Sequence, residues 1–146
     1  MCAPDWVTRD ASVVGHIGSA AVRVTLVRDA ASGRWTRDGA PAPAVDGCLD
    51  VDLGFSPGTN TLPIRRLALA VGAEAPVRAA WLSFPELSFE PLEQVYRRVA
   101  QERYEYESDS GRFRATLDLD RAGLMRRYGE FWIAEVHPAE HDGNAG

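Results

Sequence analysis

Two aspartates stand two residues apart in the segment 48–53 and are the residues of this sequence best placed to do chemistry. Asp50 and Asp52 alternate with aliphatic residues. On an extended chain both carboxylates therefore project from one face, roughly 6.5–7 Å apart at ~3.3 Å per residue. Such a pair suits a divalent metal site or general acid–base work. The alternative is structural: the carboxylates hydrogen-bond the neighbouring loop and pair with Arg65 or Arg66.

The next segment, 55–63, holds two prolines, a glycine and several small polar residues, which predicts an ordered loop. Arg65 and Arg66 follow it and, on extended chain, would face opposite sides. One of them can then pair with Asp50 or Asp52 in the interior of the protein. The other is left for solvent, a dimer partner or an anionic group.

Zinc and cofactor chemistry have no support in the sequence. Cys2 and Cys48 show no metal-ligand spacing with His16, His137 or His141. We expect Cys48 to be a buried thiol and no cofactor to be bound. No serine-hydrolase, phosphate-loop or paired C-x-x-C motif occurs either.

Charge and hydropathy narrow the class of partner. The 146 residues carry a formal net charge of −5, and all 16 basic residues are arginines spread along the chain. This balance opposes attraction to a phosphate backbone, so no nucleic-acid partner is expected. No apolar run approaches the ~20 residues that cross a bilayer, and the first residues lack a secretory leader pattern. The sequence therefore predicts a cytoplasmic location.

The elements that must position these residues are mostly strands. Period-two alternation and turn residues recur every 8–12 residues, which is typical of a mostly antiparallel β domain. The expected extended segments are 20–28, 34–37, 48–53, 67–71, 77–84, 87–89, 104–106, 113–119 and 128–136. With no repeat or linker, the chain is predicted to form one domain over residues 1–138, followed by a disordered tail, 139–146.

One segment has a helical pattern. Residues 91–101 place Leu92, Val95, Tyr96 and Val99 at i, i+3, i+4 and i+7, behind a proline suited to a first helical turn. We expect this face to pack in the core, with a ligand-lining role as the alternative.

Residues 46–67, DGCLDVDLGFSPGTNTLPIRRL, resemble the signature of the glycolipid-binding protein family, whose domain is a spiral β-roll. The stretches DWVTR at 5–9, YEY at 104–106 and FRATLDLDRAGL at 113–124 resemble it too. The resemblance covers nearly the whole chain. Family members usually have more strand-forming sequence before Trp6, so we expect this chain to be shortened there.

The resemblance implies a mostly β fold, with a curved antiparallel sheet wrapped around one short α-helix, and a homodimer. It also implies a lipid or glycolipid ligand and no established catalytic residue. The acyl chain would occupy a cavity between helix and sheet, lined by Trp81, Phe84, Phe89 and Phe113, with Tyr96 nearby. Thr59, Asn60 and Thr61 would present hydroxyls and an amide to a sugar headgroup, or else satisfy the backbone of their own loop.

With Asp50, Asp52, Arg65 and Arg66, these residues form the candidate ligand site. Two alternatives stay open from the sequence. The first is a small hydrolase or transferase that uses Asp50 and Asp52. The second is a structural or interaction module with a packed core and no ligand.

Overall fold

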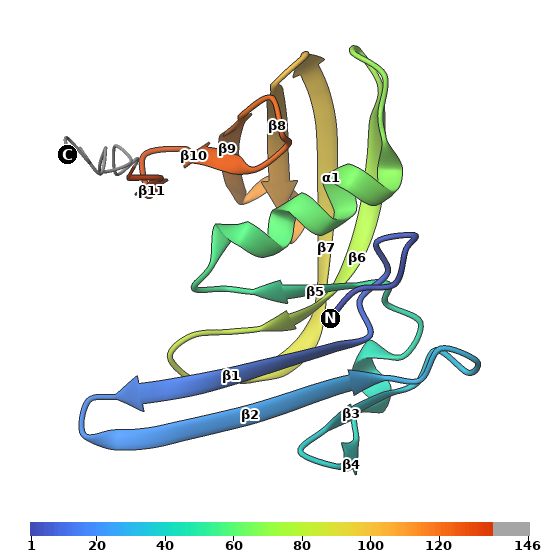
Figure 1. Ribbon diagram of the computed structural model, residues 1–146, viewed down its shortest axis with the longest axis vertical. Coiled ribbons are helices and arrows are strands. Elements are labelled where there is room, and N and C mark those ends of the chain that lie inside the picture. Colours follow the sequence, from blue (N-terminus) through green and yellow to red (C-terminus); the bar gives the residue numbers. More distant parts are fainter. Residues whose placement is uncertain (136–146) are drawn as a thin grey trace, which may run out of the picture.

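The computed structural model describes residues 1–135, which form two β-sheets and one short α-helix (Figure 1). The smaller sheet has the order β1-β2-β3-β4 and is antiparallel throughout. Its strands are β1 (Asp10–Ile17), β2 (Ala20–Arg28), β3 (Trp35–Arg37) and β4 (Ala40–Pro41). The β2–β3 hairpin confirms the prediction for segments 20–28 and 34–37.

The larger sheet has seven strands in the order β11-β10-β9-β8-β7-β6-β5. They are β5 (Asp50–Leu53), β6 (Glu74–Leu82), β7 (Phe89–Ala100), β8 (Arg103–Ser108), β9 (Phe113–Leu119), β10 (Met125–Tyr128) and β11 (Trp132–Ile133). Neighbours are antiparallel except β5 and β6, which run parallel. The mostly antiparallel pattern is therefore confirmed, with this one parallel pair as the exception. The chain returns from β5 to β6 through a helical crossover, which a parallel connection needs.

That crossover holds the 3₁₀ turn η2 (Pro57–Asn60) and the helix α1 (Thr61–Leu67). Two further 3₁₀ turns are η1 (Pro43–Val45) and η3 (Asp109–Gly111). Figure 1 shows α1 lying across the face of β6 and β7. The mostly β fold with a curved sheet around one short helix is thus confirmed. No helix among residues 1–135 is long and apolar enough to cross a membrane.

The position of the helix differs from the prediction. Residues 91–100 belong to strand β7 rather than to a helix. The predicted loop at 55–63 contains η2 and the start of α1, and the predicted strand at 67–71 is wrong, because α1 ends at Leu67 and residues 68–71 form neither helix nor strand. Two β-branched valines and a tyrosine favour a strand at 95–99. Pro91 fits there because β8 pairs with β7 only from Gln94 onward, so Pro91 lies on an open edge.

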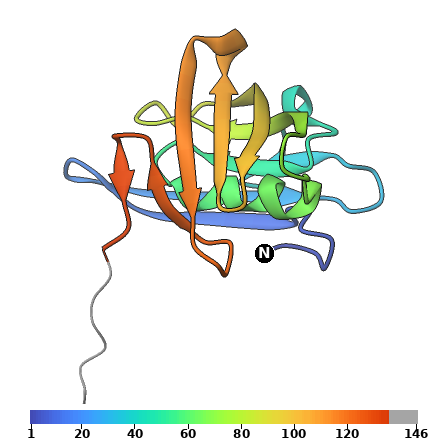
Figure 2. The ribbon, with the colours of Figure 1, turned by 90° about the horizontal axis from the view of Figure 1, so that it is seen from above.

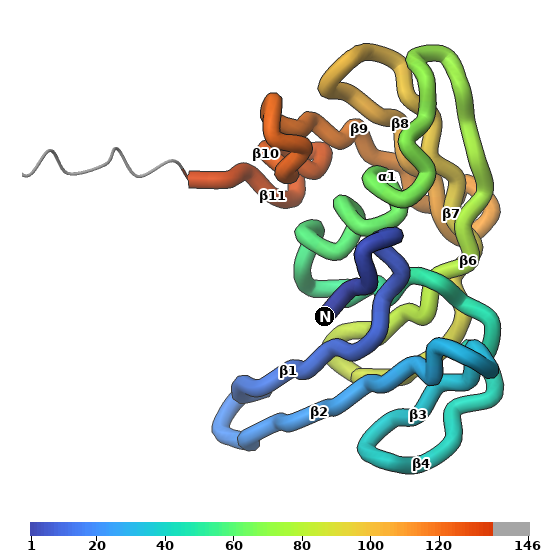
Figure 3. The backbone as a smooth tube through the Cα atoms, turned by 45° about the vertical axis from the view of Figure 1, so that its right-hand side comes forward, coloured from blue at the N-terminus to red at the C-terminus, as the bar shows by residue number. Residues whose placement is uncertain are grey.

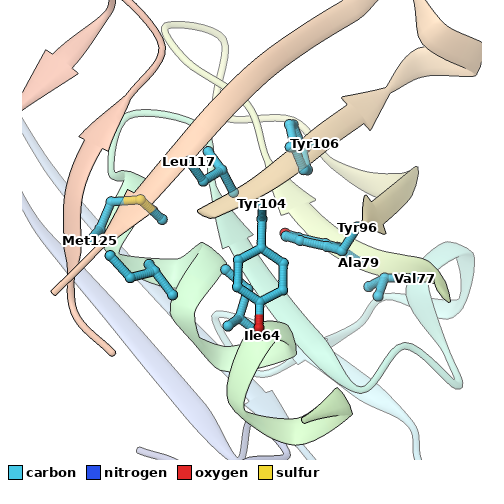
Figure 4. Close-up of a cluster of buried hydrophobic side chains, with 9 residues drawn as sticks. Ile64, Val77, Ala79, Tyr96, Tyr104, Tyr106, Leu117 and Met125 are labelled. Atoms are coloured by element: carbon cyan, nitrogen blue, oxygen red, sulfur yellow. The ribbon is translucent and has the colours of Figure 1, made fainter. Parts of the chain in front are cut away.

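Alternation along β6 divides the buried side chains into two cores. Val77 and Ala79 face α1, whereas Ala80 and Leu82 face the smaller sheet. The first core joins Ile64 of α1 to tyrosines and aliphatic residues of β6–β10 (Figure 4). The second packs β5 and β6 on the β1–β2 hairpin, which runs across the direction of β8 and β9 (Figure 2).

The first residues of the chain lie beside β5 and α1 (Figure 3). Thr8 donates its backbone N–H to the Leu49 carbonyl at 2.9 Å, and its hydroxyl accepts from the Val51 N–H at 3.1 Å. Strand β1, which follows at once, was not expected from the sequence. Val136, the proposed boundary at 138 and the tail 139–146 lie outside the described residues.

Candidate functional site

A cavity of about 710 Å³ lies between the large sheet and the segment from β5 to η2. Small-molecule sites in proteins commonly have volumes of ~300–1,000 Å³. Its polar lining residues are Asp52, Ser56, Asn60, Glu90, Ser108 and Asp109. Its apolar and aromatic lining consists mainly of Leu53, Phe55, Trp81, Leu92, Tyr106, Phe113, Tyr128, Phe131 and Trp132. The cavity therefore combines aromatic walls with a few polar groups.

Asp52 reaches the cavity from β5. Parallel pairing places Asp50 opposite Ala79 and Asp52 opposite Trp81, so both aspartates share the face that α1 covers. Oδ2 of Asp52 accepts a hydrogen bond from Nε2 of Gln94 at 2.5 Å. Burial raises the pKa of Asp52 to about 6, although this hydrogen bond opposes the shift. The cavity thus holds a carboxyl group that changes charge close to neutral pH.

A chain of buried hydrogen bonds holds Gln94 in place. The Tyr96 hydroxyl donates to Oε1 of Gln94 at 3.2 Å and accepts from Nδ2 of Asn60 at 2.8 Å. Tyr96 is fully buried, and this burial raises the pKa of its hydroxyl well above the ordinary value, so the proton stays on the oxygen. With its Oε1 engaged, Gln94 turns its amide nitrogen toward Asp52.

Aromatic rings form one wall. Phe113 stacks on Tyr128 with ring centroids 6.0 Å apart and an interplanar angle of 23°. Phe131 adds a ring whose centroid lies 5.6 Å from that of Phe113. Tyr106 contacts both Phe113 and Tyr128, at 6.1 and 5.9 Å. Burial raises the pKa values of the Tyr106 and Tyr128 hydroxyls, so both remain neutral. This wall offers flat, uncharged surface to a ligand.

Asp50 has a different environment from Asp52. Its carboxylate accepts hydrogen bonds from Nε and Nη2 of Arg66 at 3.1 and 2.6 Å, and only 1% of the residue is exposed. Neither Asp50 nor Arg66 lines the cavity. The predicted pairing of one aspartate with one arginine is confirmed, although the arginine belongs to a helix rather than to extended chain. Asp50 and Asp52 therefore do not act as two open carboxylates in one site.

The threonines of the crossover bond to their own segment. The Thr59 hydroxyl accepts from the Leu53 N–H at 3.2 Å and donates to the Ser56 carbonyl at 3.0 Å. The Thr61 hydroxyl donates to the Gly58 carbonyl at 2.5 Å. Both hydroxyls thus form hydrogen bonds with backbone groups of their own segment, which is the alternative to ligand binding that the sequence left open for this loop. Of the three crossover residues proposed for the ligand, only Asn60 lines the cavity.

Arg65 lies on the other side of α1, beside a second cavity of about 790 Å³. Its guanidinium stacks over the Trp6 ring at 4.5 Å and donates to the Ala122 carbonyl at 2.7 Å. Arg98 also lines this cavity, but it donates to the backbone carbonyls of Leu69 and Gln101. Much of the hydrogen-bonding capacity there is already used within the protein.

Of the four aromatic residues predicted to line the cavity, two do so and two lie elsewhere. Trp81 and Phe113 line the 710 Å³ cavity, and Tyr96 lies beneath it as part of the buried hydrogen-bond chain. Phe89 instead packs edge-on against Trp35 in the second core, with centroids 5.7 Å apart. Phe84 does not line the cavity either, and 54% of it is exposed.

Gln94, Tyr106 and Ser108 belong to the site but were not expected from the sequence. Gln94 was not identified as a site residue because the predicted helix at 91–101 placed it away from the apolar face. A strand interpretation would have aligned Leu92, Gln94 and Tyr96 on one face. As expected, Cys48 is a buried free thiol. Within residues 1–135, no three His, Cys, Asp or Glu side chains are grouped closely enough to hold a metal ion.

Comparison with known proteins adds two findings. A family model described as "Putative glycolipid-binding" matches residues 1–134. The crystal structure of a DUF1089-family protein from Pseudomonas aeruginosa is similar with a TM-score of 0.82 and 36% sequence identity, over 91% of this chain and 73% of that one. No curated protein matches the sequence.

Proposed function

The chain belongs to the family described as "Putative glycolipid-binding", and on this premise we propose that it binds a glycolipid or a related lipid without catalysing a reaction on it. The ligand would occupy the 710 Å³ cavity between the large sheet and the segment from β5 to η2. One observation carries the proposal: the aromatic walls of this cavity meet a polar end at Asp52. Such a site can bind both the apolar chain and the polar headgroup of an amphiphile.

The energetics assign a role to each part. Burying a methylene group contributes ~0.8 kcal/mol, so a ten-carbon stretch contributes on the order of 8 kcal/mol before the costs of association. A hydrogen bond to a sugar hydroxyl nets only ~1 kcal/mol, because water already satisfies that hydroxyl. Aromatic and aliphatic walls such as Phe113 and Leu92 would therefore supply affinity. The polar groups would supply orientation and selectivity.

Native mass spectrometry of the gently purified protein tests this proposal, followed by titration with octyl glucoside. We expect a retained lipid mass or saturable binding of the glucoside. Phe113→Ala removes a cavity wall and should weaken binding, whereas Val14→Ala, which shortens an exposed side chain of β1 outside the lining, should not. A wild-type protein that neither retains a lipid nor binds the glucoside would contradict the proposal.

A second candidate function rests on Asp52 alone. Its pKa of about 6 suits a general acid at neutral pH. The hydrolase or transferase that would use both aspartates loses support, because Asp50 is bound to Arg66. Turnover of a chromogenic glycoside that Asp52→Asn abolishes, with the fold intact by circular dichroism, would favour catalysis over binding.

A homodimer and a cytoplasmic location complete the proposal. Two features support them: β1 and β4 are edge strands of their sheet, and Cys2 and Cys48 are free thiols, as expected in a reducing compartment. Sedimentation equilibrium measures the oligomeric state, and fractionation of cells that express the full-length protein measures the location.

A further inference from the structure

The 710 Å³ cavity has polar groups at its buried end, and its exposed lining combines three aromatic rings with the carboxylates of Glu90 and Asp109. Asp52 and Asn60 lie at the buried end, where Asn60 is only 4% exposed. At the mouth, Phe55, Phe131 and Trp132 are 43%, 72% and 39% exposed. An amphiphile that entered with its tail first would bring hydrocarbon against a carboxylate and leave polar atoms beside exposed rings. An amphiphile that entered with its headgroup first would place its hydroxyls against the buried polar groups and its alkyl chain against the exposed rings.

The Asp52 carboxylate has an oxygen available to a ligand. Oδ2 accepts from Gln94, and no side chain or backbone group of residues 1–135 donates to Oδ1. No fully buried side-chain oxygen or nitrogen within that range lacks a partner. Oδ1 is therefore not fully buried, and it belongs to a residue that lines the cavity. A hydrocarbon chain cannot satisfy an ionised oxygen, whereas a hydroxyl group of a ligand can donate to it.

The charges that line the cavity set the sign of the headgroup. Asp52, Glu90 and Asp109 are the charged residues in the lining, and all three are acidic. Glu90 accepts from the Ser88 hydroxyl at 2.7 Å, and Asp109 lies 3.6 Å from Arg112, which is not part of the lining. An anionic headgroup would meet like charge at Asp52 in the buried end and at Glu90 and Asp109 in the exposed part of the lining, and would be repelled.

We propose that the cavity selects an uncharged, hydroxyl-bearing headgroup, which enters first and donates a hydrogen bond to Asp52, while the alkyl chain runs outward past Phe113 to the aromatic mouth. This inference rests on the proposed lipid-binding function and names its ligand class. Neutral glycosides of a lipid fit it. Fatty acids and lipids with phosphate, sulfate or carboxylate headgroups do not.

Three ligands with alkyl tails of seven or eight carbons test the proposal by calorimetry below their micellar concentrations. They are octyl glucoside, octyl triethylene glycol methyl ether, which has no hydroxyl, and octanoate. At about pH 7.5 Asp52 is ionised. We expect the wild-type protein to bind the glucoside most tightly and octanoate at least about 10-fold more weakly, given the strength of charge-assisted hydrogen bonds. This ranking tests the proposal without any substitution.

Asp52→Asn supplies the second test. It should weaken glucoside binding by about 10-fold, leave the ether unchanged or tighter, and strengthen octanoate binding. Asp118→Asn is the matched control, because Asp118 is paired with Arg103 outside the cavity lining. It should change none of the three affinities. Circular dichroism verifies that both variants fold.

The possible failures are distinguishable. If none of the three ligands binds the wild-type protein, the proposed lipid-binding function is wrong. If they bind but octanoate matches the glucoside, or Asp52→Asn weakens all three alike, lipid binding stands and the headgroup-first orientation is overturned.

Discussion

Replacing Asp52 by asparagine should stabilise the protein at neutral pH. The pKa of Asp52 is about 6 in the folded state against 3.8 in the unfolded chain, because burial disfavours the charged form. At 1.36 kcal/mol per pKa unit, ionisation of this group costs the folded state about 3 kcal/mol. The sign follows from proton binding: between the two pKa values the folded state binds more protons, so wild-type stability falls as pH rises through this window.

Urea unfolding from about pH 4 to about pH 8 measures the effect. The two proteins should be nearly equally stable at the acidic end, where Asp52 is protonated. Asp52→Asn should then become more stable by up to about 3 kcal/mol above about pH 6. Tyr96, Tyr106 and Tyr128 face the same carboxyl but stay neutral over this range because burial raises their pKa values. A difference between the proteins that does not change with pH would refute the reasoning.

Asp50→Asn is the informative control on the same strand. It removes the partner of Arg66 and leaves that guanidinium, whose side chain is 19% exposed, without its ion pair. Removing one partner of a buried pair typically costs ~3–5 kcal/mol. Two identical substitutions, two residues apart on one face, should thus have opposite effects on stability at neutral pH.

Three further predictions concern other residues of the two cores and of the cavity lining. Tyr96→Phe leaves Asn60 Nδ2 without its acceptor and should lower the free energy of unfolding by about 1–3 kcal/mol in urea titrations. In Gly54→Ala, the new Cβ would lie 2.8 Å from the Trp81 indole nitrogen, so the ring must move and the substitution should cost about 1–3 kcal/mol and alter Trp fluorescence. Burial raises the pKa of Cys48, so its thiol should react with a thiol reagent only after unfolding, as mass spectrometry of the labelled protein would show.

The sequence contained enough information for the sheet but not for the helix. Alternation at 20–28, 77–84 and 113–119 identified strands because these segments bury one face or both. At 91–101 the apolar residues also matched a helical spacing. Pairing with β6 and β8 decided in favour of a strand, and that pairing is a tertiary effect.

Helix α1 was missed because its sequence, TLPIRRL, has few helix signals and a proline. Pro63 is the third residue of α1, in the first turn, where its missing N–H leaves no intrahelical bond broken. Arg65 and Arg66 are favourable in the last turn because they interact with the negative end of the helix dipole. A helix of seven residues cannot be stable by local propensity alone. Packing of Ile64 into the core holds it.

The candidate site was predicted only in part, for the same reason. The pairing of an aspartate with an adjacent arginine followed from residue types. The residue types did not predict that Asp50 and Asp52 have different partners, because this depends on where Arg66 and Gln94 lie in space. The aromatic mouth at Phe131 and Trp132 likewise results from the folding of β10 and β11 onto the sheet.

A crystal structure of the protein with octyl glucoside tests the central claim most directly. We predict the glucose ring at the buried end of the 710 Å³ cavity, with a hydroxyl within hydrogen-bond distance of Asp52 Oδ1, and the alkyl chain leading past Phe113 to the mouth. A cavity left without ligand at saturating glucoside, or an alkyl chain in contact with Asp52 and a sugar ring at the mouth, would contradict the account.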